Sequence, residues 1–123
     1  MIKPAGPLWG LIVPLACVLV ISVGQILFKL ASAHLDFRRP FADPKGLAIL
    51  AVALALYGSA TLLWVAALRH APLSRLYPVM ALSFVLVPLA GLFLLREPIS
   101  AQYWLGAALI VAGLAVIGRS YAV

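Results

Sequence analysis

The chain has few charged residues and almost no acidic ones. Only 10% of its 123 residues are charged, and Asp36, Asp43 and Glu97 are the three acids. Soluble domains carry about 25% charged and about 45–50% apolar residues, whereas 66% of this chain is hydrophobic. One small core cannot bury such an excess, so the composition excludes an ordinary soluble domain, including a soluble enzyme.

Cysteine and catalytic side chains are equally scarce. Cys17 is the single cysteine, so an internal disulfide is impossible. His34 and His70 cannot assemble a metal site, and no nucleophile–base pair is visible. The net charge is +6, but the chain has no basic face with interleaved aromatic residues, which a nucleic-acid-binding module needs. Basic residues that flank membrane helices and meet anionic lipid headgroups explain this charge more simply. We therefore expect no enzyme, no metal or other cofactor, and no nucleic-acid partner.

Four apolar runs without acidic residues are each long enough to cross a membrane. As helices they would measure about 27–35 Å, against about 30 Å for the hydrocarbon core. A backbone in hydrocarbon must satisfy its own hydrogen bonds, which favours helices over other structures. The expected spans are residues 8–30, 47–68, 76–95 and 101–118. We predict an all-α membrane protein with a single four-helix transmembrane domain over residues 1–123.

The first run could also be a cleaved signal peptide, since Lys3 precedes it and Ala31-Ser32-Ala33 follows it. It is longer than the usual signal core of about 7–15 residues and contains Gln25 and Lys29, so we expect it to remain a helix. Membrane orientation stays open because the basic residues are nearly balanced, with four on one side against four or five on the other.

A polar stripe with one cation follows a face of the first run. Ser22, Gln25, Lys29 and Ser32 are spaced by three, four and three residues. Such a face should meet protein or a water-filled cavity rather than lipid. Lys29 as a point charge and Gln25 as a donor suit an anionic ligand such as a phosphate. Alternatively, the Lys29 side chain simply extends to the lipid headgroups, and Gln25 simply forms a hydrogen bond with a neighbouring helix.

No carboxylate lies within the four runs. All three acids fall in connections, where we expect Glu97 to pair with Arg96 or another cation at headgroup level. A carrier that exchanges protons for cations needs a titratable carboxylate in the membrane. A cationic substrate would instead meet Lys29 with no countercharge, which weighs against a cation exporter.

Aromatic residues mark the second and third runs. Trp64 shares a helical face with Tyr57 and Thr61, and Tyr77 opens the third run. Trp64 and Tyr77 can line a transport path, or they can simply belong to the aromatic belt at the membrane interface.

Two prolines and a serine stand out in the third run. Pro78 fits an opening turn, whereas Pro88 should kink the helix and free a carbonyl. The kink could shape a cavity or serve packing alone. Ser83, between them, could be a cavity hydroxyl or could bond back to its own helix.

The last run carries small residues that let helices approach closely in lipid. Gly106 and Gly113 are seven residues apart, and Ala108 and Ala112 are four apart. We expect a helix–helix contact here. Ser100 is the expected N-cap of this helix.

These residues follow the order and spacing of a known family. The segment 24–31, GQILFKLA, resembles a GQ-x3-K-x-A motif in the first helix of that family. The match continues in register through Leu63-Trp64, Pro72, Tyr77-Pro78-Val79-Met80, Ser83-Phe84-Val85, Glu97-Pro98-Ile99-Ser100, Trp104, Gly106 and Gly113. The chain thereby resembles the small four-helix aminoarabinose-phosphoundecaprenol flippase subunits, in the EamA-like part of the drug/metabolite transporter superfamily.

The resemblance implies a flippase or flippase subunit in the bacterial inner membrane. Its substrate would be an undecaprenyl(polyprenyl)-phosphate-linked monosaccharide such as aminoarabinose, moved for lipid A or cell-envelope modification. The fold implied is a bundle like that of small multidrug resistance transporters, surrounded by membrane lipids and paired as a homodimer or as a heterodimer with a similar small subunit. Gly106 and Gly113 resemble the dimer-contact motif of those transporters.

The resemblance also implies roles for individual residues. Gln25 and Lys29 would handle the lipid phosphate. The residues lining the path would be Trp64, Tyr77 and Ser83. The residues with gating or structural roles would be Pro78, Pro88 and Glu97.

Two departures from the family pattern keep alternatives open. Residues 36–46 do not follow it, so the sugar is undetermined. The first helix also lacks the Glu on which the multidrug members rely. The alternatives are a small multidrug-type cation exporter and a non-transporting partner subunit of another membrane protein.

Overall fold

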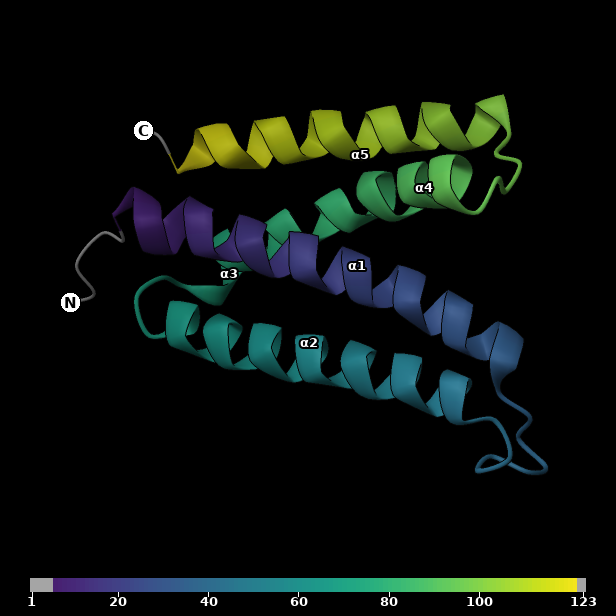
Figure 1. Cartoon of the computed structure of the whole chain (residues 1–123). Coiled ribbons are helices and arrows are strands. Elements are labelled where there is room, and N and C mark those ends of the chain that lie inside the picture. The colour runs from purple at the N-terminus through teal and green to yellow at the C-terminus, as the bar shows by residue number, and fades with distance from the viewer. Residues whose placement is uncertain (1–5, 122–123) are drawn as a thin grey trace.

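The computed structural model describes residues 6–121, and every regular element in that range is a helix (Figure 1). The elements are η1 (Leu8–Ile12), α1 (Val13–His34), α2 (Pro44–Leu68), α3 (Leu73–Leu76), η2 (Tyr77–Leu82), α4 (Ser83–Leu94) and α5 (Ala101–Ser120). Four continuous stretches are long and apolar enough to cross a membrane: Leu8–His34, Pro44–Leu68, Leu73–Leu94 and Ala101–Ser120. The prediction of an all-α protein with four membrane-spanning helices is confirmed.

The first span begins as a π-helix that ends just before a proline. Pro14 has no N–H to donate to the carbonyl four residues earlier. Just before it, the Val13 N–H donates to the Leu8 carbonyl, five residues back. At its other end α1 runs on to His34, beyond the apolar stretch.

Polar caps set where α2 and α5 begin. Asp43 is the N-cap of α2, and its carboxylate accepts from the backbone N–H groups of Lys45 and Gly46. The same carboxylate lies 3.7 Å from His34 Nδ1, which joins the ends of α1 and α2. Ser100 caps α5 as expected, accepting from the Tyr103 N–H at 3.2 Å.

The third span is not one regular helix. A single α-helical turn, α3, passes into the 3₁₀ segment η2, with Pro78 in its first turn, and then into α4. Pro88 lies inside α4 and offers no N–H to the Phe84 carbonyl. The Tyr103 hydroxyl of α5 donates to that carbonyl at 2.6 Å instead. A neighbouring helix thus satisfies the carbonyl that Pro88 frees.

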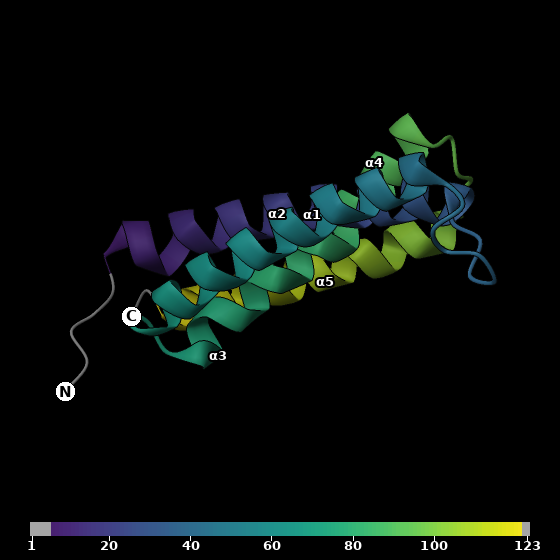
Figure 2. The same ribbon diagram turned by 60° about the horizontal axis from the view of Figure 1, so that its bottom comes forward.

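The helices α1 and α2 pack as an antiparallel pair along their length, as Figures 1 and 2 both show. Small buried residues of α2, including Ala53, Ala60 and Ala67, allow the close approach. The thiol of Cys17 lies 3.6 Å from the Ala60 carbonyl within this interface. The helix α1 also packs against α4 and η2, so it is the central helix of the bundle.

The last helix is the least covered. It meets the rest of the chain mainly at η2, and Ala107 is the only buried residue of α5. Only 6% of its most apolar 18-residue stretch is buried within the chain. The fold therefore leaves most of α5 available to lipid or to another protein.

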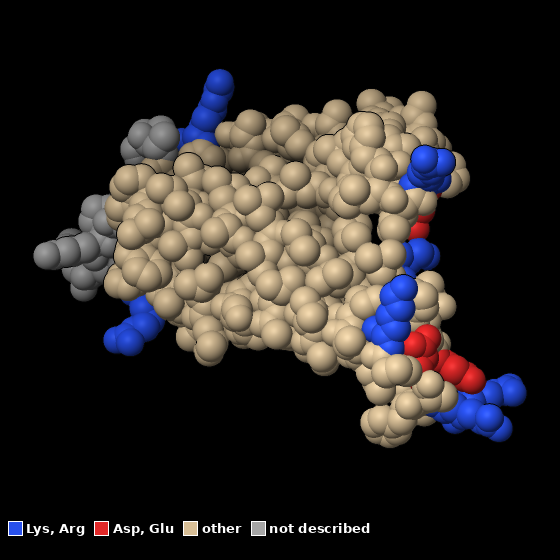
Figure 3. Space-filling view, in the orientation of Figure 1, with Lys and Arg blue, Asp and Glu red and all other residues tan. Residues whose placement is uncertain are grey.

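Charge is divided unequally between the two ends of the bundle (Figure 3). The end with the α1–α2 and α4–α5 connections carries all three acids together with several cations, and we call it the mixed-charge end. The opposite end, which we call the basic end, carries Arg69, Arg75 and Arg119, and no acid among residues 6–121. The two ends therefore present different surfaces to the lipid headgroups.

Candidate functional site

The glycine that opens the first-helix motif makes room for a tyrosine of α2. Gly24 is buried, and a Cβ there would lie 2.7 Å from the Tyr57 ring, closer than real Cβ contacts. Glycine thus lets the ring sit directly against the α1 backbone. Phe28, one turn along α1, packs beside the same ring with centroids 5.1 Å apart.

The next motif residue is bound to that tyrosine. The Gln25 side-chain amide donates a hydrogen bond to the Tyr57 hydroxyl, which fixes both groups at the α1–α2 seam. Gln25 is nevertheless exposed in the single chain. It lies about 13 Å along the helix from the α1 end at His34, so this polar side chain faces outward at membrane depth.

Lys29 lies one turn closer to the mixed-charge end and has a carboxylate partner. Its ammonium nitrogen is 3.5 Å from Oε1 of Glu97. The expectation that Lys29 would have no countercharge is therefore wrong. Glu97 is in a connection, as its position in the sequence indicates, and the two long side chains meet at the mixed-charge end. Both side chains stay open to the surroundings, with exposures of 63% and 47%.

The backbone of the α4–α5 connection holds Glu97 in place. Arg96 adopts a left-handed conformation with φ of 55°, which reverses the chain after α4. The Glu97 N–H then donates to the Gly91 carbonyl at 3.1 Å. A Cβ on Gly91 would lie 3.1 Å from the Glu97 carboxylate, so the glycine lets that carboxylate lie close to the α4 backbone.

The two serines of the predicted stripe do not join this site. Ser22 is buried and donates to the Val18 carbonyl at 2.7 Å, and Ser32 donates to the Lys29 carbonyl at 2.6 Å. Both hydroxyls are thus satisfied by their own helix. The polar groups left to meet a ligand on this face of α1 are Gln25 and Lys29.

The other candidate lining residues lie elsewhere in the bundle. Trp64 packs against the cluster of Ala67, Ala71 and Leu76 at the basic end. Tyr77 begins η2 at that same end and is 65% exposed. Ser83 bonds back to the Met80 carbonyl at 2.7 Å, one of the two alternatives considered for it. The structure thus does not bring these three side chains beside Lys29.

The two glycines of α5 face open space. A Cβ at Gly106 or Gly113 would meet no atom of another element within 4 Å among the described residues. No other helix of residues 6–121 packs closely against these two glycines.

A comparison with known families agrees with this architecture. The profile of the EamA-like transporter family matches residues 6–119, nearly the whole chain. The chain belongs to the EamA-like transporter family. It is accordingly a multi-pass membrane protein of a transporter family.

Individual relatives of this EamA-like chain carry a more specific name. It is 35% identical over 117 residues to a Pseudomonas fluorescens (strain Pf0-1) protein named probable 4-amino-4-deoxy-L-arabinose-phosphoundecaprenol flippase subunit ArnE, covering 91% of this chain and 96% of that protein. A Klebsiella pneumoniae (strain 342) protein of the same name is 42% identical over 71 residues, 58% of this chain and 63% of that one. No solved structure matches the chain.

Two contacts of the polar site could not be identified from the sequence. Tyr57 shares a helical face with Trp64, but only the packing of α2 on α1 shows that it holds Gln25. Glu97 is conspicuous in sequence as one of three acids, yet its distance in sequence from Lys29 hides their pairing. The glycine at position 24 was the available signal for a close approach by another helix.

Proposed function

We propose that this chain is a flippase subunit that moves a polyprenyl-phosphate-linked monosaccharide, such as aminoarabinose, across the bacterial inner membrane for lipid A or cell-envelope modification. The observation that carries the proposal is the exposed Lys29–Glu97 pair beside Gln25, on the central helix of an EamA-like bundle. The names of the relatives support the substrate class.

Lys29 is the proposed site for the lipid phosphate. Exposed ion pairs contribute only about 0–1 kcal/mol to stability, so a phosphate can replace the Glu97 carboxylate at little cost. A phosphate also offers more acceptor oxygens than the carboxylate does. Gln25 lies about 6 Å deeper along α1, where its amide can donate to oxygens of the same headgroup as the lipid moves inward.

Glu97 is proposed to recognise the sugar by binding its amino group. Once a phosphate occupies Lys29, the Glu97 carboxylate loses its cation. The sugar in the relatives' name carries a 4-amino group, which is a suitable new partner when protonated. Lys29 and Glu97 would then bind the two charges of one zwitterionic headgroup. This arrangement favours an amino sugar over a neutral one.

The active assembly is proposed to contain two small subunits. We take the 123 residues as one four-helix domain, and four helices alone leave Gln25 and most of α5 uncovered. Gly106 and Gly113 present a smooth surface for a second helix. A homodimer, or a heterodimer with a similar subunit, would cover α5 and enclose a polar path. Trp64, Tyr77 and Ser83 would line its far part, with Pro78 and Pro88 allowing the third span to adjust.

The mechanism proposed is transport and not catalysis. The headgroup would cross in the polar path while the polyprenyl tail stays in the lipid, so no bond is made or broken. The chain's own residues bind, release and shield the charged headgroup, and the cycle needs no cofactor.

The test is native mass spectrometry of the full chain purified from its own membrane. A bound polyprenyl-phosphate sugar in a dimer supports the proposal and identifies both the sugar and the assembly. Bulk phospholipid alone, together with an obligatory unrelated protein, would contradict it and would favour a non-transporting partner subunit.

A further inference from the structure

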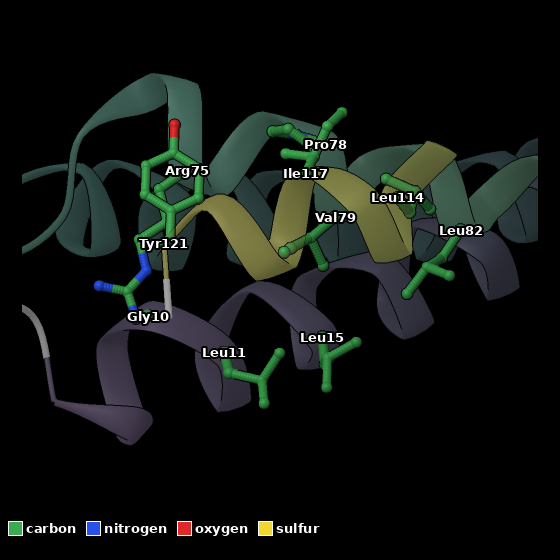
Figure 4. Close-up of a pocket in the computed structure, with 11 residues that line it drawn as sticks. Gly10, Leu11, Leu15, Arg75, Pro78, Val79, Leu82, Leu114, Ile117 and Tyr121 are labelled. Carbon is green, nitrogen blue, oxygen red and sulfur yellow. The ribbon is translucent and has the colours of Figure 1, made fainter. Parts of the chain in front are cut away.

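A cavity at the basic end has a polar mouth and an aliphatic interior. Its volume is about 310 Å³, and residues of η1, α1, η2 and α5 line it together with Arg75 of α3 (Figure 4). Leu15, Val79, Leu82 and Leu114 supply aliphatic walls. On its rim, Leu11 is 50% exposed, so the cavity opens toward the outside of the bundle.

A second cavity neighbours the first on the side away from the basic end. It has a volume of about 300 Å³ and shares Leu15 and Leu82 with the first. Its other lining residues are aliphatic as well, among them Val18, Val85 and Val111. The lining residues of the two cavities follow one another from Arg75 inward along α1, and we call the two neighbouring cavities the aliphatic channel. This shape suits an amphipathic molecule with its charged group at the basic end.

The guanidinium of Arg75 lies against a glycine at the mouth. Gly10 is buried, and a Cβ there would lie 3.0 Å from Arg75 Nη2 and 3.2 Å from Cζ. The glycine therefore lets the guanidinium lie close against the first span, as Figure 4 shows. Tyr121 closes the other side of the mouth and donates a hydrogen bond to the Ser74 hydroxyl at 2.9 Å.

Arg75 has no acidic partner within residues 6–121. The two ion pairs in that range are at the mixed-charge end, and the basic end carries no acid there. A guanidinium presents five N–H donors in a planar fork that matches phosphate oxygens. The mouth therefore selects an anionic group, and the channel behind it selects an apolar chain.

We infer that this cavity is a second binding site for the substrate lipid, in which Arg75 holds the phosphate of a polyprenyl phosphate and the aliphatic channel takes its first isoprene units. This inference rests on the proposed function. Gly10 and Lys29 are separated by about 28 Å of helix, close to the hydrocarbon thickness of about 30 Å. The Lys29 and Arg75 sites would thus receive the phosphate at opposite faces of the membrane, one before and one after the crossing.

Photocrosslinking of the full-length protein in nanodiscs tests this site. The probes are an undecaprenyl phosphate and a phosphatidylglycerol, each with a photoreactive group near the phosphate, and labelled peptides are identified by mass spectrometry. We expect undecaprenyl phosphate to label the peptides containing Val79 and Leu114. Arg75→Gln should lower that labelling about tenfold, because it removes charge-assisted hydrogen bonds.

Matched variants separate a binding role from a structural one. Arg69→Gln removes one cation from the same end but outside the cavity, and should label like the wild type. Gly10→Ala keeps the charge and displaces the guanidinium, so it should lower labelling even if Arg75→Gln folds poorly. Arg75→Lys should be labelled more strongly than Arg75→Gln but less than the wild type, since it keeps the positive charge and loses the planar fork of guanidinium donors.

Three results would overturn the inference. Equal labelling of Arg75→Gln and Arg69→Gln would remove Arg75 from the site while leaving the proposed function standing. Equal dependence of phosphatidylglycerol on Arg75 would make this a bulk-lipid site. If wild type bound no undecaprenyl phosphate at any position, this inference and the proposed function would both fail.

Discussion

The Lys29 ammonium lies 3.5 Å from the Glu97 carboxylate. This ion pair links the end of the central helix, α1, to the connection between α4 and α5. The pair lies at the mixed-charge end of the bundle, with both side chains substantially exposed. Such a pair is weak and exchangeable, since water and salt screen it. A charged ligand can therefore separate the two residues without unfolding the chain.

Glu97→Gln tests whether the Glu97 carboxylate recognises the sugar. The change removes the carboxylate that competes for Lys29, so undecaprenyl phosphate should bind at least as tightly as in the wild type. The preference for an amino-sugar headgroup over a neutral one should fall severalfold, measured by competition in native mass spectrometry. Asp36→Asn is the control, since it removes an acid at the same end that does not pair with Lys29. An unchanged preference would remove Glu97 from sugar recognition.

Gly24→Ala tests the close contact between α1 and α2. The added Cβ would lie 2.7 Å from the Tyr57 ring, so the ring must shift, and the shift strains its bond with Gln25. We expect destabilisation of about 1–3 kcal/mol, as for other overpacked sites. Thermal unfolding in detergent micelles measures it.

Gly58 provides a matched control for that change. It lies on α2 next to Tyr57, and a Cβ there meets nothing within 4 Å among the described residues. Gly58→Ala should be neutral or stabilising by up to about 1 kcal/mol, because alanine is the better helix former. Equal destabilisation by the two substitutions would mean that the Tyr57 contact is not what Gly24 provides.

Tyr103→Phe tests how the chain accommodates Pro88. The substitution removes the hydroxyl that donates to the Phe84 carbonyl, and should cost about 1 kcal/mol. Pro88→Ala supplies a backbone N–H for the same carbonyl, so Tyr103→Phe should cost almost nothing in that background. A double-mutant cycle on thermal unfolding measures the difference. The same cost in both backgrounds would show that the two residues are independent.

The four helices could be predicted from the sequence because apolar runs in lipid have one main solution. Acid-free runs near the membrane thickness must be helical, and the charged connections separate them. The helix ends were less predictable. The helix α1 continues to His34 and α2 starts at Pro44, because helices extend into the headgroup layer, where polar caps such as Asp43 satisfy them.

The candidate site was predictable only in part. Periodicity along one helix placed Gln25 and Lys29 on a shared face, because that relationship is local. It could not identify Tyr57 or Glu97 as their partners, since those contacts depend on how α2 and the α4–α5 connection pack on α1. The break of the third span into α3, η2 and α4 was likewise hidden, because Pro78 also fits the start of a regular helix.

The most direct test of the proposed phosphate site is how strongly photoreactive undecaprenyl phosphate labels the mixed-charge end of Lys29→Ala, compared with the wild type and with Lys45→Ala. Lys45 lies at the same end of the bundle and pairs with no acid through its side chain in residues 6–121. We predict a loss of labelling of about tenfold or more for Lys29→Ala, with Lys45→Ala and both thermal unfolding midpoints close to wild type. Full labelling of Lys29→Ala would contradict the proposed role of Lys29 and leave it as an anchor in the headgroup layer.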